Sequence, residues 1–138
     1  MTEGWHDKDY VVLFDEADVY RLTQAYRFPP SMIDYRVIGL IGWDDFILKK
    51  YDGSVAQIPT VPLDFEYLRP LPLSIENAKI LPDSRFVGKI KWYIQPLVFG
   101  GDATSEKNMA WLSLDQHIQA VTFWNRKYLE IRSQQAKK

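Results

Sequence analysis

An Asp-Gly pair near the middle of the chain limits the possible folds more than any other feature of the sequence. It lies in Tyr51-Asp52-Gly53-Ser54, between two runs rich in β-branched and aromatic residues, Phe46–Tyr51 and Val55–Val61. Asp-Gly readily adopts the positive φ angles that a tight hairpin turn requires. The two runs are therefore predicted to pair as antiparallel strands.

A third β-rich run, Tyr35–Ile41, precedes this hairpin and extends it to a meander over Ile33–Pro62. The last strand contains Pro59 and is followed by Pro62, and proline has no N–H to donate to a neighbouring strand. We therefore expect the third strand to lie at an edge of the sheet or to end early.

The residues before the meander have a helical period. Asp15 suits the N-cap position, and Asp18 places a carboxylate in the first turn, at the positive end of the helix dipole. Pro29–Pro30 ends the helix, and before it apolar residues recur on one face: Val19, Leu22 and Tyr26. The apolar run Tyr10–Phe14 is either a strand or the lead into this helix.

The second half of the chain contains its most β-like run, Val87–Phe99, which is closed by Gly100–Gly101. Apolar and more polar residues alternate here, which predicts one buried and one semi-polar face. The alternating residues are Ile90, Trp92 and Ile94 on one side and Lys91, Tyr93 and Gln95 on the other. A short strand at Asn108–Leu112 is expected to follow.

A long helix is predicted at the C-terminal end. Ser113 and Gln116 have the spacing of a capping box, in which two side chains satisfy backbone N–H groups at the start of a helix. The helix is expected to run from about Leu114 to about Arg132. Its apolar stripe consists of Leu114, Ile118, Val121, Tyr128 and Ile131, with Trp124 close by.

Strands in the middle with helices at both ends predict an α+β domain, in which a short N-terminal and a long C-terminal helix pack on an antiparallel sheet. The proline-rich connection Leu63–Asp83 is expected to hold one helical turn at Ser74–Lys79. The 138 residues have the length of one domain, 1–138, with an ordered core at about 10–132 and a basic tail at 133–138.

Composition excludes several classes of protein. The chain has no cysteine, which excludes disulfides, thiolate nucleophiles, zinc fingers and iron–sulfur sites. No apolar run approaches the roughly 18 residues of a membrane helix, and the first residues lack the basic and apolar regions of a signal peptide. A pI near 6.1 argues against nucleic acid as the main ligand. We therefore expect a cytoplasmic protein that binds neither a membrane nor nucleic acid directly.

The formal net charge of −1 conceals two halves of opposite sign. Residues 1–66 contain 12 acidic and 6 basic side chains, whereas residues 67–138 contain 6 acidic and 11 basic ones. Such asymmetry can steer association with a charged partner. The simpler interpretation is that the two ends are solvated or fold near one another.

The common motifs for catalysis and cofactor binding are missing from the sequence. His6 and His117 are the two histidines, and neither has a second histidine at metal-ligand spacing, so no metal is predicted. Glycine-rich nucleotide motifs and the nucleophile elbow are missing as well. We therefore predict no cofactor, and the missing motifs weigh against the familiar classes of enzyme.

A few polar residues in aromatic surroundings are the candidates for function. Asp44–Asp45 follows Trp43 at a bend, where two carboxylates can share a proton, bind a cation, act as acid and base, or cap the turn. Asp102 follows two glycines, which favours a turn over a phosphate-binding loop. His117 is part of a polar cluster facing a partner, or a nearby carbonyl satisfies it. Four tryptophans are core anchors or interface contacts, with at least two expected in the core: Trp43, Trp92, Trp111 and Trp124.

Several blocks occur in a characteristic order of β-rich segments, a Gly-Gly turn and a closing helix. They are Gly42–Phe46, Asp52-Gly53, Ile58–Pro62, Lys89–Tyr93, Phe99–Asp102 and Asn108…Trp111…His117…Trp124-Asn125…Tyr128. Over about residues 33–131 the chain resembles small bacterial proteins found among toxin-immunity genes, of which the SUKH superfamily is the nearest named group. The resemblance implies an α+β fold and a non-enzymatic protein that binds a cognate toxin domain and blocks its active site.

Toxins that attack nucleic acid are commonly basic, so an acidic patch around Asp7–Asp18 or Asp44–Asp45 would mimic phosphate and raise the association rate. The residues expected to contact such a toxin are Asp15, Glu16, Asp18, Trp43, Asp44, Asp45, Asp102 and His117. Two alternatives remain open. One is a small acid–base hydrolase that uses Asp44, Asp45, Asp102 and His117, and the other is a homodimeric adaptor domain that buries its aromatic residues at a two-fold interface.

Overall fold

The computed structural model describes residues 1–42, 44–71 and 79–136. Its main sheet is a six-stranded antiparallel meander, in which neighbours in the sheet are also neighbours along the chain. The strands are β1 (Thr2–His6), β2 (Asp9–Leu13), β3 (Tyr35–Ile41), β4 (Asp45–Lys50), β5 (Val55–Pro59) and β6 (Arg69–Pro70). The predicted meander is confirmed, and β3 has the predicted bounds. β5 ends at Pro59, two residues earlier than the predicted strand, and pairs with β6 at only two positions.

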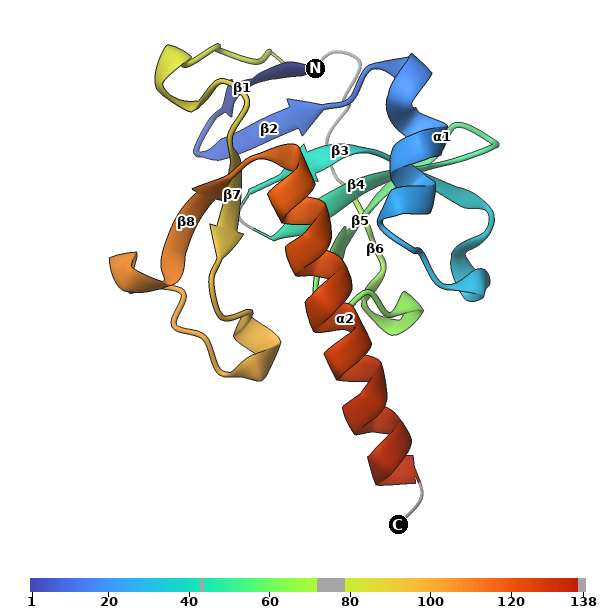
Figure 1. Ribbon diagram of the computed structural model, residues 1–138. Coiled ribbons are helices and arrows are strands. Elements are labelled where there is room, and N and C mark those ends of the chain that lie inside the picture. Colours follow the sequence, from blue (N-terminus) through green and yellow to red (C-terminus); the bar gives the residue numbers. More distant parts are fainter. Residues whose placement is uncertain (43, 72–78, 137–138) are drawn as a thin grey trace.

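In the described part of the chain, two α-helices and a second, smaller sheet lie against the meander (Figure 1). α1 (Glu16–Ala25) joins β2 to β3 and packs on β3, and α2 (Leu114–Ala136) crosses the meander before its last turns extend beyond the sheet. β7 (Ile90–Tyr93) and β8 (Met109–Leu112) form an antiparallel pair beside the first turns of α2. The α+β architecture predicted from the sequence is therefore correct.

The main core lies between the meander and the elements that cover it. β4 and β5 contribute Phe46 and Ile58, α1 contributes Leu22, α2 contributes Val121 and β7 contributes Trp92. The opposite face of the meander carries a smaller apolar cluster of Val11, Ile41, Ile47 and Leu71. Of the other tryptophans, Trp5, Trp111 and Trp124 pack partly buried against the main core, and Trp43 lies outside the described residues.

The local sequence signals are visible in the hydrogen bonds of these elements. In the β4–β5 hairpin the Lys50 amide donates to the Ser54 carbonyl over 2.9 Å, and Gly53 has a φ of 91°. At the start of α2 the Gln116 amide donates to the Ser113 hydroxyl over 3.2 Å, and the Ser113 amide donates to Gln116 Oε1 over 3.0 Å. The predicted hairpin and capping box are both confirmed.

The run Val87–Phe99 forms a shorter strand than the sequence predicts. β7 ends at Tyr93. Pro96 lies just before the 3-10 turn Leu97–Phe99, and a proline ring is better suited to such a turn than to the continuation of a strand. All four residues of β7 are buried, whereas Ile94 is exposed. The predicted alternation of a buried and a semi-polar face is therefore wrong.

Regular secondary structure also occurs outside the ordered core predicted at about 10–132. β1 pairs with β2 along its whole length, and α2 continues through 133–136 of the predicted tail. In the long connection before β7, the described residues form the 3-10 turn Phe65–Tyr67 and the two-residue strand β6. Most of the helical turn predicted at 74–79 falls on 72–78, outside the described residues.

Candidate functional site

Asp44 and Asp45 lie where the chain turns from β3 into β4, and Asp45 is the first residue of β4. The Arg69 guanidinium donates a hydrogen bond to the Asp45 carboxylate, with 2.6 Å between Nη2 and Oδ2. Arg69 belongs to β6, which the meander holds on the far side of β5, so this ion pair spans three strands. The Asp45 side chain is only 13% exposed. The two carboxylates are thus partly buried and do not lie in a solvated turn.

Burial changes the protonation chemistry of both carboxyl groups, because a charged carboxylate is less stable away from water. It raises the pKa of Asp44, and the positive charge of Arg69 opposes the shift. Burial and the charge of Asp44 raise the pKa of Asp45 to about 6, again against the influence of Arg69. Asp45 therefore takes up a proton at a higher pH than an ordinary aspartate.

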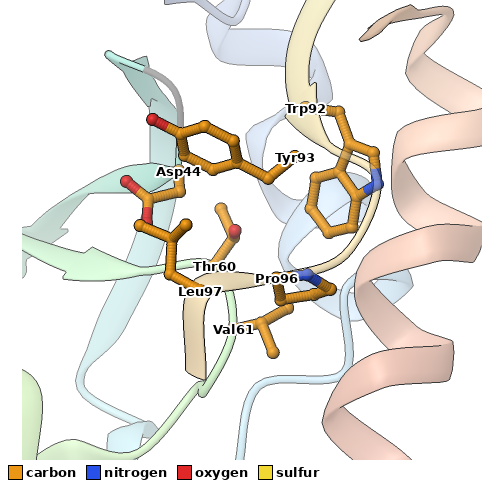
Figure 2. A pocket seen from close by; sticks show the side chains of 7 residues that line it. All are labelled: Asp44, Thr60, Val61, Trp92, Tyr93, Pro96 and Leu97. Carbon is orange, nitrogen blue, oxygen red and sulfur yellow. The ribbon is translucent and has the colours of Figure 1, made fainter. Parts of the chain in front are cut away.

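A small pocket opens beside Asp44, and we call it the Asp44 pocket (Figure 2). Its volume is about 10 Å³, which is close to the smallest space that holds one water molecule. Aromatic and apolar side chains form most of its wall. The lining residues are Asp44, Thr60, Val61, Trp92, Tyr93, Pro96 and Leu97.

Thr60 is the most deeply buried polar residue of this pocket. Its backbone amide donates to the carbonyl of Asp44 over 2.6 Å, which fixes the end of β5 against the start of β4. Its side chain is 1% exposed, and its Oγ1 has no hydrogen-bond partner among the described residues. Figure 2 shows this side chain directed into the space between Tyr93, Trp92 and Pro96. A buried hydroxyl without a partner is energetically costly, so a ligand that bonds to it is stabilised.

A second cavity of about 10 Å³ shares Asp44 and Thr60 with the Asp44 pocket and also borders Asp45, Lys91 and His117. Residue types that can act as acid or base therefore border one space for a single water molecule. Their charged groups have other partners, since Asp45 is bonded to Arg69 and the Lys91 ammonium group lies over Trp5. The volume leaves no room for a substrate.

His117 is a core residue. It is 1% exposed, and its Nδ1 shares a hydrogen bond of 2.8 Å with the Tyr26 hydroxyl. Burial lowers the pKa of His117 to about 3, so the ring is neutral at physiological pH. The prediction that His117 contacts a partner is therefore wrong. Its side-chain partner is a hydroxyl from the end of α1, not the carbonyl that the sequence interpretation considered.

Lys91 occupies a buried position on β7 and is only 6% exposed. Its Nζ lies 4.6 Å from the ring centroid of Trp5 and 5.8 Å from that of Trp111. Burial lowers the pKa of Lys91, and the charge of Asp9 opposes this shift. Aromatic faces attract a cation, which is how this molecule holds an ammonium group inside its fold.

The other acidic residues predicted to contact a partner lie elsewhere. Asp15 accepts a hydrogen bond from the Met1 ammonium group at 3.1 Å, and Asp18 pairs with Arg21 at 3.3 Å, both at the start of α1. Asp102 accepts hydrogen bonds from the amide and hydroxyl of Thr104, which lower its pKa. Acidic side chains therefore lie both at the start of α1 and at the bend before β4, the two places that the sequence offered for an acidic patch.

The predicted contact residues thus divide into separate places on the fold. Asp44 and Asp45 lie together, with buried His117 behind them. Asp15, Glu16 and Asp18 mark the start of α1, and Asp102 lies in the loop between β7 and β8 on the other side of α2 (Figure 1). Trp43 lies outside the described residues.

Exposed apolar side chains lie on the segment that leads away from the Asp44 pocket. Ile94, Leu97 and Val98 are exposed although they follow the most buried strand of the molecule. Leu97, which is 39% exposed, also forms part of the pocket wall. The mouth of the pocket therefore combines apolar surface with a carboxylate.

A much larger groove of about 720 Å³ lies between α1 and the strands β3 and β4. Its rim includes the exposed side chains of Tyr20, Ile33 and Tyr51. Arg36 also lines it, with its guanidinium 5.7 Å from the ring centroid of Tyr51. Tyrosine and arginine are frequent in protein interfaces, so this groove is a second candidate surface.

The sequence did not predict a functional role for four residues at this site: Thr60, Arg69, Tyr93 and Leu97. Thr60 lies between two prolines, at a position where a strand ends, and that context is the one local signal for an unusual environment. The role of Arg69 depends on the pairing of β6 with β5, which no local pattern encodes. These residues become recognisable only from the three-dimensional arrangement.

Within the described residues, no group of three or more histidine, aspartate or glutamate side chains is placed to share a metal ion. Nor does any helix in this part of the chain have the length and apolar character to cross a membrane. No protein-family model matches the sequence, and neither a curated protein nor a solved structure is similar to it. The assignment of function therefore depends on the geometry of the molecule.

Proposed function

We propose that this chain is an immunity-type protein that binds a cognate toxin domain and blocks its active site. The observation that carries the proposal is the surface at the Asp44 pocket. There a carboxylate without an ion-pair partner among the described residues lies next to exposed apolar side chains on the segment after β7. The same function is the one that the resemblance of about residues 33–131 to the SUKH superfamily implies.

This surface has the two properties that an inhibitor of a basic enzyme needs. Apolar side chains such as Leu97 and Val98 supply area that is removed from water on binding. The carboxylate of Asp44 favours a partner of positive charge and disfavours a negative one. Toxins that attack nucleic acid are commonly basic, and the Asp44 carboxylate would take the place of a phosphate group in such a site.

The hydrolase alternative has less support from the geometry. Asp102 is bound within its own turn, and neutral His117 is held by Tyr26. The cavities beside Asp44 are each close to the volume of one water molecule. We therefore favour protein binding over hydrolysis, because the exposed surface around the Asp44 pocket can contact a macromolecule, whereas these cavities cannot hold a substrate.

Affinity capture followed by an inhibition assay tests this function. The wild-type protein and a Leu97→Asp variant are used as baits in lysate of the source cell, at low and high salt, and captured proteins are identified by mass spectrometry. We expect a partner that is retained by the wild type and lost by Leu97→Asp. The captured protein is then purified, and its enzymatic activity should fall to background at one equivalent of wild-type chain.

Leu129→Asp is the matched control, since Leu129 is also an exposed leucine but lies far along α2. It should capture and inhibit the partner like the wild type. A partner whose activity is unchanged by the wild-type chain would contradict the inhibitor function. Recovery of a second copy of this chain alone would favour the homodimeric adaptor.

A further inference from the structure

We propose that the Asp44 pocket is a recognition site for an ammonium group, supplied by a lysine side chain of the partner protein. The identity of this donor rests on the proposed function, whereas the ammonium chemistry rests on the pocket itself. The pocket offers a carboxylate, a free hydroxyl and two aromatic side chains around a space of about 10 Å³. Together these groups match the hydrogen-bonding and charge properties of an ammonium ion.

The charged groups around the pocket leave Asp44 as the carboxylate available to a ligand. Asp45 is bonded to Arg69 at 2.6 Å. Lys91 lies over the ring of Trp5 and is influenced by the charge of Asp9. Within the described residues Asp44 has no ion pair; burial raises its pKa, and the charge of Arg69 opposes that shift. A cation that enters the pocket therefore compensates a carboxylate that has already lost much of its hydration.

Thr60 provides an independent reason to expect a ligand. Its Oγ1 is buried, lacks a partner among the described residues and points into the pocket. An ammonium group has three donors and no acceptor, so it can donate to the Asp44 carboxylate and to Thr60 Oγ1 together. The third donor is free for the partner's own groups or for water at the mouth.

The walls of the pocket suit the rest of a lysine side chain. Trp92 and Tyr93 present aromatic rings, which attract cations, and Leu97 presents apolar surface at the mouth for methylene groups. The same fold already holds the ammonium group of Lys91 between Trp5 and Trp111. A guanidinium group is planar and wider, so a space for one water molecule favours ammonium over guanidinium.

Titration with methylammonium chloride tests the site without any partner. Binding is followed in NMR spectra through the backbone amide of Thr60, with sodium chloride at equal ionic strength as the reference. Because the affinity of a ligand with two heavy atoms is limited, we expect a Kd on the order of 10 mM. Guanidinium chloride and tetramethylammonium chloride at the same low concentrations should shift the Thr60 signal no more than sodium does.

Three variants identify the groups that bind. Asp44→Asn and Thr60→Val each remove one acceptor and should weaken methylammonium binding by roughly tenfold or more, because hydrogen bonds to a charged group are strong. Thr60→Ser keeps the hydroxyl and should bind like the wild type. Each variant is first shown to be folded from its dispersed NMR spectrum, so that lost binding is not confused with lost structure.

An equal response of wild type and Asp44→Asn would overturn the ammonium site. So would a crystal structure grown in methylammonium that has only a water molecule in the pocket, or a stronger response to guanidinium than to methylammonium. The outcome is separable from that of the proposed function. If methylammonium binds but no toxin is inhibited, the site stands and the function fails. If Asp44→Asn inhibits the toxin as well as the wild type, the function stands and the lysine pocket fails.

Discussion

Two core side chains, Tyr26 and His117, are linked by a hydrogen bond between elements that are far apart in the sequence. The bond joins the end of α1 to the first turns of α2 over 2.8 Å. Burial raises the pKa of Tyr26 and lowers that of His117, so both groups are neutral. Two neutral polar groups that satisfy each other can be buried at little cost, whereas either one alone cannot.

Tyr26→Phe tests the value of this bond. The change removes only the hydroxyl and leaves the imidazole Nδ1 of His117 without its partner. We expect a loss of about 1–3 kcal/mol in the free energy of unfolding, measured by urea denaturation. Tyr20→Phe is the control, because the Tyr20 side chain is exposed and should change stability very little. Equal stabilities of the two variants would contradict the role of the bond.

Asp45→Asn tests the buried carboxylates through the dependence of stability on pH. The folded-state pKa of Asp45 is raised to about 6 from an ordinary value of 3.8, so the folded protein binds this proton more tightly than the unfolded chain. Its contribution to stability is complete below pH 3.8 and is lost as the pH rises through about 6. The wild type should therefore lose stability relative to Asp45→Asn between these values.

The comparison is made by thermal unfolding of both proteins at a series of pH values. His117 has the opposite pH dependence, since its lowered pKa makes the folded state less stable in acid, but it is present in both proteins and cancels. The ion pair with Arg69 titrates together with Asp45 and is already contained in its folded-state pKa, so only a pH-independent offset between the two proteins leaves the slopes equal. Parallel curves across this range would show that Asp45 has an ordinary pKa.

At the scale of elements, the start of α2 depends on one side chain that the sequence identifies. Ser113→Ala removes the hydroxyl that accepts from the Gln116 amide. We expect a loss of about 1 kcal/mol, which lowers Tm by roughly 3–6 °C in a chain of this size. Ser113→Asp keeps a capping oxygen and should unfold near the wild-type temperature. A Ser113→Ala variant as stable as the wild type would mean that tertiary contacts alone hold this turn.

The elements that the sequence predicts well are those with strong local signals. β3 is rich in β-branched and other apolar residues, the β4–β5 hairpin has its Asp-Gly turn, and α2 has its capping box. β1 was missed because Gly4 and the polar residues around it give no period. Gly4 is required by packing, since a Cβ there would collide with the backbone of Leu81. Such a requirement comes from a neighbour 77 positions away and leaves no pattern nearby.

The candidate site was predictable only in part, for a similar reason. Adjacent aspartates at a bend are visible in the sequence, and Asp44 and Asp45 do form the centre of the site. Their environment is not visible, because it depends on Thr60 from the end of β5, on Arg69 from β6 and on β7 packing above them. The alternating sequence pattern of β7 predicted a semi-polar face that includes Lys91. Lys91 is buried instead, because the rings of Trp5 and Trp111 lie close to its ammonium group.

At the scale of the whole molecule, the two sheets share one core. Tyr10 from the meander makes an edge contact with Trp111 from β8 at 5.5 Å, and Phe86 stacks on Trp111 at 4.0 Å. Trp92 from β7 belongs to the same buried cluster as residues of β4, β5, α1 and α2. A hairpin of two strands is too small to be stable alone, so β7 and β8 depend on these contacts.

Because the two sheets share one core, we predict that the molecule unfolds in one cooperative step. Urea unfolding curves from far-UV circular dichroism and from tryptophan fluorescence should coincide, because the tryptophans report on the contact between the sheets while dichroism reports on both helices and strands. Trp92→Ala should lower the free energy of unfolding by about 3–5 kcal/mol in both signals, since it leaves a cavity where the sheets meet. If that variant does not fold, Trp92→Phe retains an aromatic ring and should show a smaller loss with the curves still coincident. Fluorescence that changes at lower urea than dichroism would mean that the β7–β8 pair separates first, and the cooperative core described here would then be wrong.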